Sequence, residues 1–163
     1  MAGRVFFSFD YDRDIWRVSQ VYNSWVAKSD SETAGFLDAA SWERLNWKGD
    51  KAVLKWIDRE LERTPVTVVL IGYQTSSNEL VEYEIKQSRL LGKELFGIYI
   101  HNIKDQDGKT DTKGKNPFEN FCIEEKGEMK YLSQVYPTYD WVDNDGYNNF
   151  ADWVERAFRN AGR

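Results

Sequence analysis

Short apolar runs alternate along this chain with longer segments in which apolar residues recur every three or four positions. The runs are typical of strands buried on both faces of a parallel sheet, and the periodic segments are typical of amphipathic helices. We expect strands at residues 4–9, 35–39, 66–72, 95–101 and 136–142. We expect helices at 13–27, 42–63, 77–91 and after 146, with a polar surface loop at 102–117 and no clear pattern at 118–134.

This alternation predicts an α/β fold, because consecutive parallel strands need a crossover that is usually a helix. Five strands favour a flavodoxin-like, three-layer domain with a mostly parallel sheet in the order 2-1-3-4-5. No linker, internal repeat or low-complexity tract divides residues 1–163, so we expect a single domain. Folds of this class bind ligands beyond the carboxyl ends of their strands.

Composition narrows the possible functions. The 163 residues carry a net charge of −5, and the lysines and arginines are interspersed with acidic residues. A protein that binds nucleic acid without sequence preference needs a basic stripe, so we expect no nucleic-acid partner. No apolar run reaches the ~20 residues of a membrane span. The N-terminus also lacks the layout of a signal peptide, and we expect a cytoplasmic protein with no membrane partner.

Cysteine and histidine chemistry is limited to Cys122 and His101, the sole residues of their types. One cysteine forms no internal disulfide, and this number fits a reducing compartment. One cysteine and one histidine are also too few ligands for a zinc site built from Cys and His clusters, so we expect no bound metal.

Known nucleotide and phosphate motifs are missing from the sequence. No G-x-G-x-x-G follows the first expected strand, so the dinucleotide-binding motif of Rossmann folds is absent. No G-x-x-x-x-G-K-[ST] occurs either, so a P-loop is absent. Asp10 and Asp12 follow the first strand, as the acidic cluster of a phospho-receiver would. The strand at 66–72 ends without an aspartate to phosphorylate, which disfavours that function.

Glu84 lies on the apolar face of its expected helix. When each residue is advanced by about 100°, Glu84 falls within the arc that includes Val81, Ile85 and Ser88. A carboxylate on that face must be paired, protonated or bound to a ligand. Periodicity leaves open whether it is a structural acid satisfied by arginine or backbone groups, or an acid in a pocket that is poised for chemistry.

The same helix has a candidate start signal. Ser76 followed by Glu79 matches the S-x-x-E capping box, which predicts a helix that begins near Ser77. The free N–H groups at such a terminus can hold a phosphate.

Several segments together resemble the TIR-like ThsB family of bacterial Thoeris antiphage systems. They are VFFSFDYDRDIWRVSQVYNSWV (5–26), TVVLIGYQTSSNELVEYEI (67–85), GIYIHNIKD (97–105), the triplet at 116–118 and VYPTYDWVDNDGYNNFADWV (135–154). The Tyr-Glu-Ile step at 83–85 carries the glutamate of the wider TIR pattern. The resemblance extends over nearly the whole chain.

The resemblance implies an enzyme that cleaves NAD+, as substrate and without a further cofactor, at the nicotinamide–ribose bond. It implies a cyclic or conjugated ADP-ribose product that activates a ThsA-type effector, a phage-derived trigger and homo-oligomers formed through TIR–TIR contacts. By position, Glu84 would be catalytic. The residues that would bind the substrate are Phe6, Ser8, Asp10, Tyr11, Ser76, Leu80, Tyr83 and Asn116.

Two positions depart from the family pattern. TIR enzymes often have a tryptophan four residues before the glutamate, where this chain has Leu80, and ThsB relatives often have histidine where it has Asp10. Stacking on a base must then come from elsewhere, or be weaker. These departures keep open an alternative: a non-catalytic signalling module that acts through protein–protein association.

Overall fold

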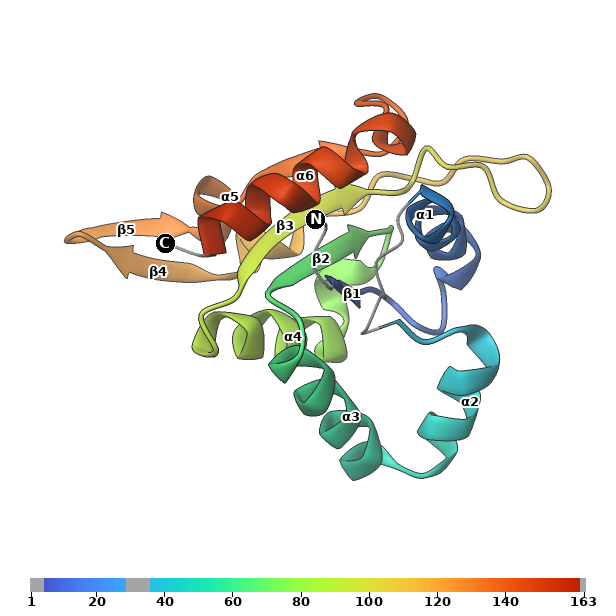
Figure 1. The fold of residues 1–163 in the computed structure, drawn as a ribbon, viewed down its shortest axis with the longest axis horizontal. Coiled ribbons are helices and arrows are strands. Elements are labelled where there is room, and N and C mark those ends of the chain that lie inside the picture. Colours follow the sequence, from blue (N-terminus) through green and yellow to red (C-terminus); the bar gives the residue numbers. More distant parts are fainter. Residues whose placement is uncertain (1–4, 29–35, 162–163) are drawn as a thin grey trace.

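A four-stranded parallel sheet lies between two layers of helices (Figure 1). The structure is a computed structural model that describes residues 5–28 and 36–161. The strands, in their spatial order, are β1 (Val5–Ser8), β2 (Val66–Ile71), β3 (Glu94–Tyr99) and β6 (Thr138–Asp140). Every neighbouring pair in this sheet is parallel.

Helices cover both faces of the sheet. The principal helices are α1 (Ile15–Lys28), α2 (Ala39–Trp47), α3 (Asp50–Glu62), α4 (Glu79–Leu90) and α6 (Gly146–Ala161). Figure 1 shows α6 on one side of the sheet and α4 on the other, with α3 packed beside α4. None of the helices in the described part of the chain is both long and apolar enough to cross a membrane.

The strands have no polar face because each side of the sheet meets helices. All residues of β1 and β2 are buried. Successive side chains of a strand point to opposite faces. In β1, Phe7 accordingly packs against Tyr22 and Phe150 of α1 and α6, while Ser8 contacts α4. Because of this alternation, Ser8 and not Phe7 points to the face of the sheet on which Glu84 lies.

The predicted fold class is confirmed, with four strands in place of five. The four strands of the parallel sheet follow the expected order, but the expected strand at 35–39 is absent. Gly35 lies outside the described residues, 36–38 form no regular element, and Ala39 already begins α2. The side chain of Asp38 accepts a hydrogen bond from the Ser41 N–H, so this segment caps a helix.

The expected helix at 42–63 is two helices that meet at a sharp break. Gly49 has φ 104° between α2 and α3, a backbone conformation that favours glycine. Figure 1 shows the pair as a V that extends away from the sheet.

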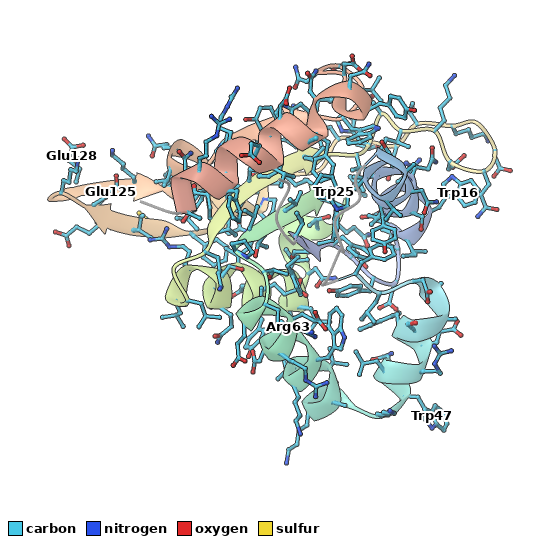
Figure 2. The ribbon with its side chains drawn as sticks, viewed as in Figure 1. Trp16, Trp25, Trp47, Arg63, Glu125 and Glu128 are labelled. Carbon is cyan, nitrogen blue, oxygen red and sulfur yellow. The ribbon has the colours of Figure 1, made fainter. Side chains whose placement is uncertain are left out.

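Two further segments complete the fold. Residues 117–135 contain a 3₁₀ turn η2 (Pro117–Asn120), a hairpin of β4 (Cys122–Glu125) and β5 (Glu128–Tyr131), and the short α5 (Leu132–Val135). Figure 2 shows Glu125 and Glu128 at the outer end of this hairpin. A second 3₁₀ turn, η1 (Thr75–Ser77), precedes α4.

The polar loop predicted at 102–117 is fixed against α1. Arg17 donates from Nε to the Ile103 carbonyl at 2.7 Å, and Arg13 donates from Nη2 to Asp111 Oδ2 at 2.6 Å. Near its end the loop touches β2 so closely that a Cβ on Gly114 would overlap the carbonyl oxygen of Gly72. A Cβ on Gly72 would in turn overlap the Asp14 carboxylate. The loop is therefore anchored at several points.

Candidate functional site

Glu84 projects from the buried face of α4 toward the carboxyl end of β1. Its side chain is fully buried, as are those of Val81, Ile85 and Ser88 on the same face. Ser8 Oγ donates to Glu84 Oε1 at 2.7 Å, and the Tyr11 hydroxyl donates to Oε2 at 2.7 Å. Both carboxylate oxygens are therefore held by residues from the end of β1 and the turn that follows it.

The surroundings of Glu84 contain no compensating positive charge. In the described parts of the chain, no lysine or arginine forms a salt bridge with it. Burial raises the pKa of Glu84 to about 8, against the opposing hydrogen bonds from Ser8 and Tyr11. Burial and the neighbouring Glu84 also raise the pKa of Tyr11 well above its ordinary value. Glu84 is consequently mostly protonated at neutral pH in this arrangement.

Tyr11 contacts two aromatic rings, stacking on Trp42 and packing at a tilt against Phe9. Its ring centroid lies 4.7 Å from that of Trp42 with 19° between the planes, and 4.4 Å from that of Phe9. The Trp42 indole donates from Nε1 to Asp12 Oδ1 at 2.8 Å. Tyr11 thus connects the buried acid, through its hydroxyl, with an aromatic wall that reaches α2.

Two hollows meet at this wall. The larger has a volume of about 650 Å³ and is lined by Tyr11, Asp12, Ile15, Ala39, Trp42, Glu43, Asn46 and Trp47. The smaller has a volume of about 290 Å³ and is lined by Trp42, Asn46, Asp50, Val53, Leu54, Glu79, Leu80 and Tyr83. Trp42 and Asn46 line both hollows, so the two form adjoining parts of one surface between α2, α3 and α4.

A third hollow, of about 500 Å³, lies on the other side of Asp12. It is lined by Asp10, Asp12, Arg13, Gln74, Ser77 and Asn78. Glu84 lines none of the three hollows. Of the residues that hold its carboxylate, Tyr11 also borders the larger hollow, so movement of the Tyr11 side chain would connect Glu84 with that hollow.

Five of the predicted substrate-binding residues lie around this arrangement. Ser8 and Tyr11 contact Glu84 directly, and Leu80 and Tyr83 line the smaller hollow. The Tyr83 hydroxyl is engaged with Asp58 Oδ1 at 2.6 Å, which links α4 to α3. Asp10 borders the third hollow and accepts hydrogen bonds from the backbone N–H groups of residues 12 and 13.

The other three predicted substrate-binding residues have structural surroundings. Phe6 is fully buried and packs against Trp56 of α3. The Ser76 carbonyl accepts a hydrogen bond from Asn120 Nδ2. None of the three lines any of the three hollows.

Asn116, the last of these three, is not brought to Glu84. Its Oδ1 accepts from the Phe118 N–H and its Nδ2 donates to Thr138 Oγ1, so its amide caps η2 and holds it to β6. β6 forms the opposite edge of the sheet from β1, on which Ser8 lies. The resemblance predicts that Asn116 binds the substrate. In the structure, the sheet order places the strand that Asn116 contacts at the opposite edge from Ser8 and Glu84.

The start of α4 also differs from the prediction. Asn78, not Ser76, caps the helix, since Asn78 Oδ1 accepts from the N–H groups of Leu80 and Val81. Two glutamates, Glu79 and Glu82, lie in the first turn. Occupied N–H donors and nearby negative charge disfavour the phosphate site expected at this terminus.

Trp42 is the principal site residue that sequence reasoning missed. It was placed only as the first residue of a helix, and its contact with Tyr11 joins positions 31 residues apart, which periodicity does not detect. A local signal was present: Asp38 is a good N-cap, and a helix that begins after it places Trp42 one turn in, on the inner side.

The site combines a buried acid with aromatic side chains that border two hollows. A search of the described residues finds no group of three or more His, Cys, Asp or Glu side chains placed to hold a metal ion. The available chemistry is that of one carboxyl group, two hydroxyl groups and a set of aromatic faces.

Comparison with known proteins gives two matches. Residues 6–105 match the family described as "Thoeris protein ThsB, TIR-like domain", a range that includes Ser8, Tyr11, Trp42 and Glu84. A protein of Bacillus cereus (strain MSX-D12), named "Putative cyclic ADP-D-ribose synthase ThsB1", is 37% identical over 191 aligned positions. The alignment covers 94% of this chain and 100% of the relative.

Proposed function

The chain belongs to the Thoeris ThsB family of TIR-like domains, and from that premise we propose that it converts NAD+ to nicotinamide and a cyclic ADP-ribose nucleotide. The observation that carries the proposal is the fully buried Glu84, held by Ser8 and Tyr11 and without a cation, behind an aromatic wall that borders two hollows. The name of the Bacillus cereus relative supports the same class of product.

The carboxyl group of Glu84 has a clear role in such a reaction. The C–N bond between ribose and nicotinamide breaks, and its electron pair leaves with the ring nitrogen, so the departing nicotinamide is neutral. The ribose then carries an oxocarbenium-like positive charge. A carboxylate beside it stabilises that charge or holds the ribose hydroxyls, as in glycoside hydrolysis.

Access to Glu84 requires a change at Tyr11. The Tyr11 hydroxyl occupies Oε2 in this structure, while Ser8 holds Oε1 from the interior. If the Tyr11 ring slides along the face of Trp42 toward the larger hollow, Oε2 becomes available to the substrate ribose, Oε1 keeps its donor and the Tyr11–Trp42 stack is retained. The positive nicotinamide ring of the bound substrate would also favour the ionised carboxylate.

Ring closure follows from the exclusion of water. An adenine nitrogen or a ribose hydroxyl oxygen attacks the cationic carbon through its lone pair and forms the new bond. A proton then passes from the adenine amino group or from that hydroxyl to the Glu84 carboxylate or to water, which gives a cyclic nucleotide. Water at the same carbon would give free ADP-ribose. The aromatic rings of Phe9, Tyr11 and Trp42 shield the position next to Glu84 and so favour the internal nucleophile.

The biological setting is part of the same proposal. The nucleotide would act as a diffusible signal for a ThsA-type effector after infection by phage, and the enzyme would work in the cytoplasm, where NAD+ is present. A phage-derived trigger and TIR–TIR association between copies would control its activity.

The test compares nicotinamide release from NAD+ by the wild-type protein, Glu84→Gln and Glu82→Gln. Glu82 is an exposed residue of the same helix that pairs with Lys86 at 2.8 Å, which makes it a matched control. Each protein is assayed alone and in lysate from phage-infected cells. We expect Glu84→Gln to lose about 100-fold or more of the rate, and Glu82→Gln to keep it.

Two outcomes would contradict the proposal: equal release by wild type and Glu84→Gln, or no release by wild type in infected lysate. The pH profile adds a second measurement. Because burial raises the pKa of Glu84 to about 8 and the ionised form is required, kcat/KM for wild type should rise between pH 7 and 9.

A second candidate function is a non-catalytic module that signals by association. The observation that favours it is that both Glu84 oxygens are already occupied and Leu80 stands where TIR enzymes often have tryptophan. Self-association that rises with protein concentration, without NAD+ turnover in infected lysate, would support this candidate over the enzyme.

A further inference from the structure

We propose that Trp42 is the stacking residue of this site, and that a planar nitrogen heterocycle of the dinucleotide binds against it in the smaller hollow between α2, α3 and α4. This inference rests on the proposed function, since it names the residue that would hold that substrate. It also assigns a role to a residue that lies far from Glu84 in the sequence.

The first step in the argument is that Trp42 is held rigidly. One face of the indole stacks on Tyr11 at 4.7 Å and 19°, and Nε1 donates to Asp12 Oδ1 at 2.8 Å. The residue is only 7% exposed. A side chain that is already immobilised loses little conformational entropy when a ligand stacks on it.

The second step is the position of the indole between the two hollows. Trp42 lines both, and one of its faces is occupied by Tyr11. The smaller hollow is therefore bordered by an aromatic side chain of α2, by Val53 and Leu54 of α3, and by Leu80 and Tyr83 of α4. Such apolar walls suit the faces of a planar ring.

The third step is the polar part of the same hollow. Asn46, Asp50 and Glu79 lie among its lining residues and supply an amide and two carboxylates. Carboxylate oxygens accept hydrogen bonds from N–H groups. The nicotinamide and adenine rings of NAD+ each carry an exocyclic NH₂ group, so both match this chemistry, and the experiment below separates them.

The fourth step concerns distance along α4. Leu80 lies one helical turn before Glu84, so the smaller hollow is adjacent to the turn of the helix that carries the acid. A tryptophan at position 80 would have supplied an aromatic face from α4 itself. In this chain the aromatic face on the same hollow comes from α2, across the V that it forms with α3.

Trp47 is the competing candidate, because it lines the larger hollow. It is 91% exposed, and Figure 2 shows it at the outer end of α2, directed away from the body of the molecule. Stacking on Trp47 would have to order a side chain that is free in solvent. The geometry therefore favours Trp42.

The experiment measures ligand binding in the full chain carrying Glu84→Gln, in which turnover does not interfere. The ligands are NAD+, nicotinamide mononucleotide and ADP-ribose, and each is titrated by calorimetry into this parent protein. The same titrations are made with four double variants, in which the parent also carries Trp42→Leu, Trp42→Phe, Trp47→Leu or Trp56→Leu. Trp56 is the matched control: it lies on α3, packs on Phe6 and lines none of the three hollows.

We expect Trp42→Leu to weaken NAD+ binding at least 10-fold, equivalent to about 1.4 kcal/mol. Trp42→Phe keeps a smaller aromatic face and should weaken it less, while Trp56→Leu should stay within about twofold of the parent. The fragment that loses affinity in Trp42→Leu identifies the ring: nicotinamide mononucleotide for nicotinamide, ADP-ribose for adenine.

The proposal is overturned if Trp42→Leu binds NAD+ within about twofold of the parent, if Trp47→Leu causes the larger loss, or if neither the parent nor the wild-type protein binds NAD+. Should Trp42→Leu not fold, Leu54→Phe decides. It places a larger side chain on the α3 wall of the smaller hollow and leaves Trp42, Tyr11 and Asp12 unsubstituted, and unchanged NAD+ binding by this variant would equally overturn the proposal.

Activity assays with Glu84 restored separate this inference from the proposed function. If wild type releases nicotinamide and Trp42→Leu shows the same KM, the stacking role is wrong and the enzymatic function stands. If NAD+ binding depends on Trp42 but wild type releases no nicotinamide in infected lysate, the stacking role stands and the enzymatic function is wrong.

Discussion

Two buried carboxyl groups lie near the carboxyl edge of the sheet, and their surroundings differ. Glu84 is fully buried and accepts hydrogen bonds from two neutral hydroxyls. Asp14 is 1% exposed, and its Oδ1 accepts a hydrogen bond from the Arg13 guanidinium at 2.8 Å. Its Oδ2 has no hydrogen-bond partner among the residues that the structure describes.

The pKa values reflect this difference. Burial raises the pKa of both acids, but the Arg13 charge opposes the effect at Asp14 and limits its pKa to about 6. At Glu84 only two hydroxyl donors oppose burial, and the pKa reaches about 8. A nearby cation thus restrains one acid, whereas the other is left with a large penalty on its charged form.

The two acids also connect to different parts of the molecule. Arg13 contacts Asp14 and, through its other terminal nitrogen, Asp111 of the long loop, so Asp14 belongs to the set of contacts that fixes this loop. Glu84 contacts Tyr11, which borders a hollow. The comparison teaches that burial alone does not mark a functional acid. In the described residues Glu84 differs from Asp14 in having no salt-bridge partner and in contacting a side chain that borders a hollow, and the proposed role of Glu84 rests on that difference.

The largest expected effect is on the pH dependence of stability in Glu84→Gln. The folded pKa of Glu84 is raised from 4.5 to about 8, so its stabilising contribution is complete below pH 4.5 and is lost as pH rises to about 8. Glutamine does not titrate. From pH 5 to 9, the free energy of unfolding of the variant should therefore rise relative to wild type by roughly 4 kcal/mol.

Chemical denaturation across this pH range measures the difference. Glu82→Gln on the exposed face of the same helix serves as control and should run parallel to wild type. If the free energies of unfolding of wild type and Glu84→Gln changed in parallel with pH, the pKa of Glu84 would be ordinary. Glu84 and Asp14 would then not differ in the way described above.

A smaller effect is expected from Arg13→Gln, which converts Asp14 into an acid without a cation. Loss of the contacts with Asp14 and Asp111 should destabilise the protein by about 2 kcal/mol at pH 7, since Asp14 is left buried and charged. The pKa of Asp14 should rise above 6, and the destabilisation should shrink below pH 5, where Asp14 is neutral. Denaturation at pH 5 and 7 tests this prediction, and an equal loss at both values contradicts it.

The smallest effect is expected from Tyr11→Phe, which removes one of the two hydroxyls on Glu84. The aromatic stack with Trp42 remains, and the cost should be about 1 kcal/mol, that of one buried hydrogen bond. The Tyr11 donor lowers the pKa of Glu84, so its removal should raise that pKa further. An NMR titration of the Glu84 carboxyl carbon measures the shift, and a lower pKa in the variant contradicts the hydrogen bond.

Sequence patterns predicted the parts of the site that depend on local geometry. The helical phase of residues 80–91 placed Glu84 on the buried face, because 3.6 residues per turn holds wherever the helix forms. The strands β1, β2 and β3 were also predicted, since their apolar runs match burial on both faces, and the short β6 lies within the strand expected at 136–142. The β4–β5 hairpin lies in the segment in which the sequence shows no clear pattern.

The parts that depend on distant contacts were not predicted from patterns. Trp42 meets Tyr11 because α2 folds back over the end of β1, and nothing in the spacing of apolar residues encodes that return. The expected strand at 35–39 failed because Asp38 offers a helix cap within a short apolar stretch. The substrate-binding role of Asn116 stays a prediction from resemblance, because in the structure its amide bonds to Thr138 of β6, at the edge of the sheet opposite β1.

The close approach of Gly72 to Asp14 restricts which substitutions these two positions can accept together. A methyl group at position 72 would occupy the space of the Asp14 carboxylate. Gly114 lies so close to the Gly72 carbonyl that a Cβ at 114 would overlap it. An alanine at 72 therefore requires a shorter side chain at 14. Across relatives we expect positions 14 and 72 to covary. A relative with a larger residue at 72 and an aspartate at 14 should have a different backbone path where the long loop meets the end of β2.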